Sequence, residues 1–234
     1  MKNKKILIII SFLIITSLLV YYIIRNNADA KKFKREYESY NEVYDKILDV
    51  EYRNIKIPSN NLIKYSKASD IISLINNNKT FLVYFGDGSS HYCRLVIEEL
   101  LKTLDQEGID ILYYVNINNI RDKKAVSDSG TVIEEIAGSS DYMKLTQIFS
   151  DVIDDYILYD DNEEIVLKEK RINDSTLIAV VNGVPIESTM GIGDYFTSVD
   201  MELTEKIKKI QHDEFIKIID YVKPSQSCNE DLPC

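Results

Sequence analysis

The sequence predicts an α/β protein in which a mixed sheet is flanked by helices and preceded by a membrane-spanning helix. Apolar runs typical of buried strands alternate with segments of helical periodicity between residues 52 and 154. Asn182–Gly183 stands between two further apolar runs, which predicts a tight antiparallel hairpin. An uncharged apolar segment covers residues 6–24. Strands joined by helices and followed by a hairpin predict both parallel and antiparallel pairs in one sheet.

The N-terminal apolar segment has the length of a membrane span. Residues 6–24 carry no charge, and three lysines precede them. Nineteen residues at about 1.5 Å per residue extend roughly 28 Å, close to the apolar thickness of a bilayer. The apolar part of a cleaved signal peptide is shorter, about 7–15 residues. We therefore interpret residues 1–25 as an uncleaved single-pass anchor; cleavage near Ala28-Asp29-Ala30 is the alternative.

The charge distribution indicates the compartment and excludes some partners. The lysines before the span favour a cytoplasmic N-terminus, although basic residues also follow the span, and a short N-terminal anchor exports what comes after it. Four of the 28 basic residues lie within residues 1–25, so the remainder carries 24 basic and 38 acidic side chains, a net charge of −14. This balance argues against nucleic acid as a partner and against binding flat on anionic lipid. We predict an extracytoplasmic domain at the cell membrane.

A linker over residues 26–50 connects the span to the domain. Within it, residues 31–50 have the periodicity of an amphipathic helix, with one apolar stripe. Too few heptads are visible for a coiled-coil stalk, so we expect the stripe to pack on the domain. The stripe consists of Phe33, Tyr37, Tyr40, Tyr44 and Ile47.

The domain follows this linker, and segments with the periodicity of strands alternate in it with segments that have the periodicity of helices. Pro185 predicts an edge strand after the hairpin turn, and Gly108 predicts the end of the second domain helix. In order, we expect a strand at 52–58, a helix at 69–76, a buried strand at 80–85, a helix at 90–106, a strand at 109–117, an irregular insertion at 118–140, a helix at 142–154, two short strands within 156–172, the hairpin at 176–189 and a helix at 201–222.

This order resembles the thioredoxin fold over residues 51–223, with the 118–140 insertion as an addition. In that family the run "FLVYFG" would be the central strand that leads to the C-x-x-C motif. Cys93 matches the second cysteine, Ser90 occupies the position of the first, and His91 and Tyr92 stand between them. The run "STLIAVVNG" gives a second match, to the family's cis-proline, apolar strand and Asn-Gly turn, with Ser175 at the proline position.

Both departures from the family pattern remove redox chemistry. A hydroxyl without an adjacent base is a poor nucleophile, so Ser90 is expected to cap the helix instead. Cys93 lies on the apolar face of the helix and is expected to be a small buried hydrophobe. A cis peptide bond is essentially a proline property, so the loop at Ser175 is expected to be trans. Ser90, His91, Tyr92, Cys93 and Ser175 thus form a vestigial redox site.

The resemblance and these departures predict a membrane-anchored module that binds an envelope protein or an extended peptide. The alternative is a residual thiol–disulfide oxidoreductase or isomerase that uses Cys93, alone or with a cysteine of the polar tail, residues 224–234. Cys228 and Cys234 in that tail can pair outside the cytoplasm, or remain free thiols. Three cysteines and two histidines without ligand spacing predict no metal, and we expect no cofactor.

Overall fold

The computed structural model describes residues 16, 28–160, 163–193 and 195–223. The predicted span at 6–24 and the cysteine tail at 224–234 therefore lie outside the described residues. Among the helices that are described, none combines the length and the apolar character needed to cross a bilayer.

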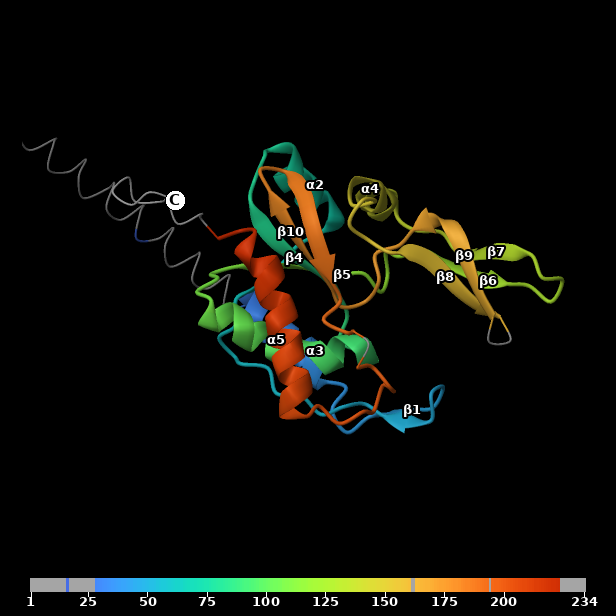
Figure 1. Ribbon diagram of the computed structural model, residues 1–234, viewed down its shortest axis with the longest axis horizontal. Coiled ribbons are helices and arrows are strands. Elements are labelled where there is room, and N and C mark those ends of the chain that lie inside the picture. The colour runs from blue at the N-terminus through green and yellow to red at the C-terminus, as the bar shows by residue number, and fades with distance from the viewer. Residues whose placement is uncertain (1–15, 17–27, 161–162, 194, 224–234) are drawn as a thin grey trace, which may run out of the picture.

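The body of the protein is a five-stranded mixed sheet in the order β11-β10-β4-β5-β3 (Figure 1). Strands β3 (Ile63–Tyr65), β4 (Phe81–Gly86) and β5 (Leu112–Asn116) are parallel. Strand β10 (Thr176–Val181) runs antiparallel to β4, and β11 (Val184–Thr189) pairs with β10 at the edge. The predicted mixed sheet is confirmed.

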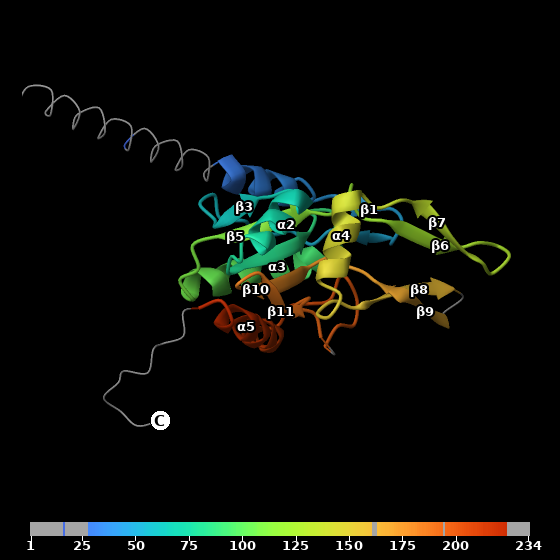
Figure 2. The same cartoon turned by 90° about the horizontal axis from the view of Figure 1, so that it is seen from above.

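Helices cover both faces of this sheet, and each face has its own apolar core. Helices α2 (Ala68–Asn76) and α4 (Ser140–Ile148) pack on one face. Helices α3 (His91–Gln106) and α5 (Glu205–Asp220), with the helical residues 28–38, pack on the other (Figures 1 and 2). Every residue of the central strand β4 is buried because both of its faces are covered.

The predicted hairpin turn at Asn182–Gly183 and the predicted start of α3 at Ser90 are both confirmed. Asn182 and Gly183 adopt φ angles of 51° and 77°, the left-handed region that a two-residue hairpin turn requires. Pro185 lies on the edge strand, where its missing N–H costs no ladder bond. Ser90 caps α3 by accepting a hydrogen bond from the Cys93 amide, as predicted.

The predicted helix at 31–50 is too long. The helix ends at residue 38, and a small hairpin follows, with strands β1 (Tyr44–Asp45) and β2 (Val50–Glu51). Asp45 Oδ1 accepts hydrogen bonds from the amides of Ile47 and Leu48, a turn that competes with continued helix. As a result the predicted stripe divides: its first two residues are buried and its last two are exposed.

The segment at 52–58 is extended but is not a strand of the sheet, contrary to the prediction. The Tyr52 amide donates to the Val43 carbonyl, and the other hydrogen-bonded backbone groups bind side chains instead of a strand of the sheet. The Asn41 amide exchanges two hydrogen bonds with the backbone of Ile55, and Glu38 accepts one from the Ile57 amide. Because these groups are already satisfied, the first strand of the sheet forms later, at β3.

The insertion at 118–140 is not irregular, which corrects a further prediction. Strands β6 (Lys123–Val126) and β7 (Val132–Ile136) form an antiparallel hairpin within it. Gly130 has a φ of 75° in the connecting turn, a conformation that glycine adopts without strain.

A second hairpin accompanies the first. Strands β8 (Asp155–Asp160) and β9 (Glu163–Lys170) confirm the two short strands predicted within 156–172. The two hairpins lie side by side and project from the body in both views (Figures 1 and 2). The Lys124 amide donates to the Tyr156 hydroxyl at 2.8 Å, and the Arg171 guanidinium lies 4.1 Å from the same ring centroid. These contacts join the hairpins at their base.

Candidate functional site

The five predicted site residues come together at the carboxyl end of the central strand. Strand β4 ends at Gly86, and residues 90–93 form the start of α3. Thr176 pairs with Phe85 across the β10–β4 ladder, so Ser175 lies at the level of Gly86. The fold thus places the helix start and the Ser175 loop beside each other, as predicted.

Cys93 is fully buried under this junction. A Cβ atom added to Gly86 would lie only 2.6 Å from Cys93 Sγ, so the thiol packs directly against the strand backbone. The pKa of Cys93 is raised to about 11, mainly by burial and in addition by the negative charge of Asp174. The Tyr84 hydroxyl and the Ser90 side chain oppose this effect without cancelling it. A reactive thiol needs the opposite, exposure and a lowered pKa.

His91 is buried. Its Nε2 lies 3.0 Å from Asp45 Oδ2, and its ring stacks on Tyr52 with 4.2 Å between centroids and 11° between planes. The hydrogen bond with His91 is the main cause that lowers the pKa of Asp45. The imidazole is therefore directed to the β1–β2 hairpin, and it does not serve as a base for Ser90 or Cys93.

Ser175 occupies a reshaped loop. Its φ is 64°, its side chain is fully buried, and its hydroxyl donates to the Met190 carbonyl at 2.9 Å. No cis peptide bond occurs among the described residues, in line with the trans loop expected at Ser175.

Asp174, next to Ser175, is a site residue that the sequence reasoning missed. The Arg121 guanidinium lies 2.9 Å from its carboxylate, and burial raises the pKa of Asp174 against the opposing effect of Arg121. The only signal was a polar run directly before a buried strand. Nothing in the sequence pairs that run with an arginine in a remote insertion.

The chain's own N-terminal helix covers the carboxyl ends of the parallel strands, where open α/β sheets usually bind ligands. The Glu36 carboxylate accepts hydrogen bonds from the Tyr114 hydroxyl at 2.6 Å and from the Asn116 amide at 2.8 Å, and also from the Tyr65 hydroxyl. The approach is close, since a Cβ on Gly88 would lie 2.7 Å from the Glu36 carbonyl oxygen. This end of the sheet is therefore filled by the protein itself.

Arg94, the residue after Cys93, holds the covering segment in place. It is almost completely buried, and its guanidinium donates to oxygens from three parts of the chain. Nε donates to the Arg53 carbonyl at 2.9 Å, Nη1 to the carbonyls of Gly88 and Tyr37, and Nη2 to the Asn41 side chain at 2.6 Å. The position that follows the family's second cysteine is thus a structural centre.

A cavity of about 660 Å³ opens at the opposite end of the sheet, beside the starts of β3 and β5 and the second half of α3. It contains none of the predicted site residues. Its charged lining is mixed in sign and consists of Lys56, Lys64, Glu98, Lys102, Asp105 and Asp110.

No group of three His, Cys, Asp or Glu side chains is arranged to hold a metal ion within the described residues. Cys93 is a free thiol. Cys228 and Cys234 lie outside the described residues, and their pairing stays a prediction.

No protein-family model matches the chain, and no curated protein matches it.

Proposed function

We propose that the chain is a thioredoxin-like module that does not exchange disulfides and that binds a protein or an extended peptide outside the cytoplasm. The strand order supports the resemblance: two parallel crossovers, then an antiparallel hairpin, with α3 opening directly after the central strand. The two sequence anchors, at Cys93 and at Asn182–Gly183, fall on the expected elements of that order.

One observation carries the loss of redox activity: the Cys93 thiol is fully buried against Gly86, and its pKa is raised to about 11. Thiol–disulfide exchange needs a thiolate that can reach a disulfide sulfur. The Ser90 hydroxyl at the other end of the motif is buried, and it accepts the Cys93 amide as a helix cap.

We expect the partner to bind beside residues 90–93, on the surface that the N-terminal segment does not cover. Tyr92 is partly exposed and its ring lies 5.4 Å from that of Phe196, which forms an aromatic pair at the rim. Aromatic side chains of this kind are common anchors in polypeptide recognition. We expect an extended peptide to contact this pair and not the buried thiol.

The redox prediction is tested on the full chain in detergent micelles, as wild type and as the Cys228→Ser/Cys234→Ser variant. We expect no insulin reduction by either protein, and at neutral pH we expect alkylation of Cys93 in the variant only after denaturation. In native protein the alkylation rate should still be rising at pH 10, because the pKa is raised. Turnover that is lost on Cys93→Ala, with fast native alkylation at neutral pH, would instead establish the residual oxidoreductase.

The compartment is tested by fusing alkaline phosphatase, which needs export to become active, after residue 225. The uncharged segment at 6–24 and the lysines before it support an anchored, extracytoplasmic domain. We expect active, membrane-bound fusion protein. Inactive but stable fusion protein would place the domain in the cytoplasm, and active protein in the medium would show cleavage near Ala30.

A further inference from the structure

The β1–β2 hairpin presents a cluster of apolar side chains to solvent. We define the hairpin tip as residues 43–48. Within it Ile47 is 94% exposed, Leu48 54%, Tyr44 49% and Val43 38%. Single exposed apolar residues are common on protein surfaces, but four within six residues of one hairpin are a local concentration of apolar surface, a feature that marks interaction sites.

The hairpin tip has a defined conformation before any partner binds. Asp45 Oδ1 accepts the amide of Ile47 at 2.8 Å and that of Leu48 at 3.3 Å, which closes a turn around the two most exposed residues. Asp49, with a φ of 57°, accepts a hydrogen bond from the Tyr44 hydroxyl on the other side of the turn. A preorganised loop loses little conformational entropy on binding.

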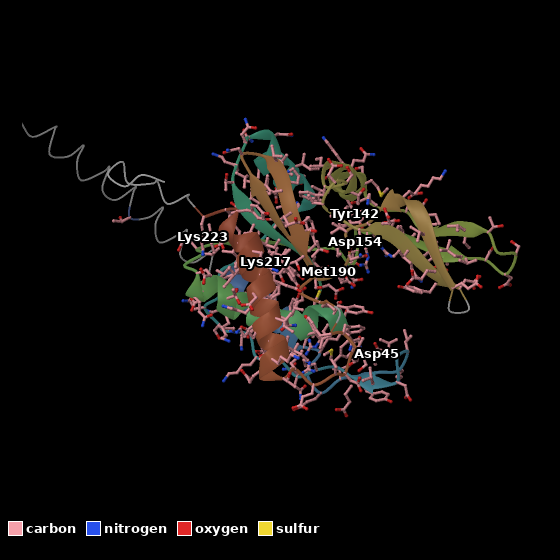
Figure 3. All side chains as sticks on the ribbon, viewed as in Figure 1. Asp45, Tyr142, Asp154, Met190, Lys217 and Lys223 are labelled. Carbon is pink, nitrogen blue, oxygen red and sulfur yellow. The ribbon has the colours of Figure 1, made fainter. Side chains whose placement is uncertain are left out.

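The same carboxylate attaches the hairpin tip to the body. Asp45 Oδ2 lies 3.0 Å from His91 Nε2 and accepts the Tyr52 hydroxyl at 3.2 Å, while the Tyr52 ring stacks on His91. Figure 3 labels Asp45 on this hairpin, which lies away from Lys217 on α5. A position of the vestigial motif, His91, therefore anchors the element that carries the exposed apolar residues.

The charges around the hairpin tip indicate the charge of the partner surface that can bind it. Glu42, Asp49 and Glu51 are exposed carboxylates beside the apolar side chains, and Lys46 is the one basic residue of the hairpin tip. A negatively charged border disfavours an anionic lipid surface, and the chain's net charge of −10 disfavours a second copy. A projecting apolar group with an acidic border is complementary to a recess with a basic border.

We propose that the hairpin tip docks into an apolar pocket of a partner protein, bordered by Lys and Arg side chains. This inference rests on the proposed function, a binding module, and adds to the Tyr92–Phe196 pair a second surface and the chemistry of the partner that fits it. Ile47 and Leu48 would fill the pocket, and the surrounding carboxylates would pair with its border.

The test places a photo-crosslinking amino acid at residue 47 of the full chain, expressed in its native host. The matched control carries the same label at Val166, which is 57% exposed on the projecting β9 strand. We expect at least fivefold more adduct from position 47, with a captured peptide that is apolar and flanked by Lys or Arg when sequenced by mass spectrometry. Equal yields at the two positions, adducts with lipid, or adducts with a second copy would each overturn the proposal.

The role of Asp45 is tested with the label kept at residue 47. Asp45→Ala removes the turn and the contact with His91, and it should lower the adduct yield at least fivefold while the body stays folded by circular dichroism, whereas Asp45→Asn keeps the acceptor of the turn and most of the yield. Equal yields from all three proteins would refute the preorganised tip. The thiol assays are independent of these readouts. Redox turnover would refute the proposed function alone, and absence of the adduct with an inert Cys93 would refute only the docking site.

Discussion

The two ends of helix α3 are built in opposite ways. At its N-terminal end, residues 28–53 cover the helix start and the ends of the parallel strands, and Arg94 and Glu36 bind buried polar groups there. At its C-terminal half, Lys102 and Asp105 line an open cavity of about 660 Å³. The end that would carry thiol chemistry by family resemblance is thus the sealed end, and the open end contains none of the predicted site residues.

The side chains at the N-terminal end of α3 have structural roles. The side chain of Ser90 caps a helix, and that of Arg94 holds the N-terminal segment. Because these groups are buried, each lost partner would leave an unsatisfied polar atom. Substitutions at the sealed end should therefore cost far more than substitutions at the open end.

The largest effect is expected from Arg94→Met. Methionine keeps the apolar stem, but the carbonyls of Tyr37, Gly88 and Arg53 lose their buried donor. We expect the free energy of unfolding to fall by about 2–4 kcal/mol, measured by urea denaturation of the full chain in micelles. A loss below about 0.5 kcal/mol would mean that water or another donor replaces the guanidinium, and that this end is not sealed.

Gly86→Ala should cost about 1–3 kcal/mol through overpacking, because the new Cβ would lie 2.6 Å from Cys93 Sγ. Cys93→Ala in the same chain removes the sulfur and should restore part of that loss. A double-mutant cycle measured by denaturation isolates the contact. Additive effects of the two substitutions would contradict the packing of the thiol against Gly86.

Ser90→Ala should cost about 1 kcal/mol, the usual value of a helix cap. Ser139 provides the matched control, because it caps α4 through the Tyr142 amide at 3.3 Å, as Ser90 caps α3 through the Cys93 amide at 3.4 Å. Thermal denaturation of the two alanine variants should give similar losses. A loss confined to Ser139→Ala would show that the Ser90 hydroxyl does not cap α3.

The smallest effects are expected at the open end. Lys102 is mostly exposed and pairs with Glu99 at 3.0 Å on the same helix. We expect Lys102→Met and Asp105→Asn to change the free energy of unfolding by less than about 0.5 kcal/mol. Losses comparable to that of Arg94→Met would show that both ends of α3 are equally important for stability, and would remove the distinction.

Sequence reasoning succeeded where the cause of structure is local. The Asn182–Gly183 turn depends on backbone angles of two residues, and the Ser90 cap on a hydrogen bond across three. The predictions of a long helix at 31–50, a strand at 52–58 and an irregular insertion at 118–140 were wrong. At 31–50 the apolar stripe continued past the true helix end, because nothing in its period shows that the Asp45 side chain closes a turn.

Sequence patterns alone predicted the order of most elements, the mixed character of the sheet and the acidic balance of the chain. Tertiary structure decided that His91 is buried, that Arg94 is a structural centre and that the N-terminal segment fills the carboxyl edge of the strands. The physical reason is distance along the chain. The contact between His91 and Asp45 joins residues 46 positions apart, and that between Arg94 and Tyr37 joins residues 57 apart. Periodicity and turn chemistry act over a few residues, so they contain no signal for such pairs.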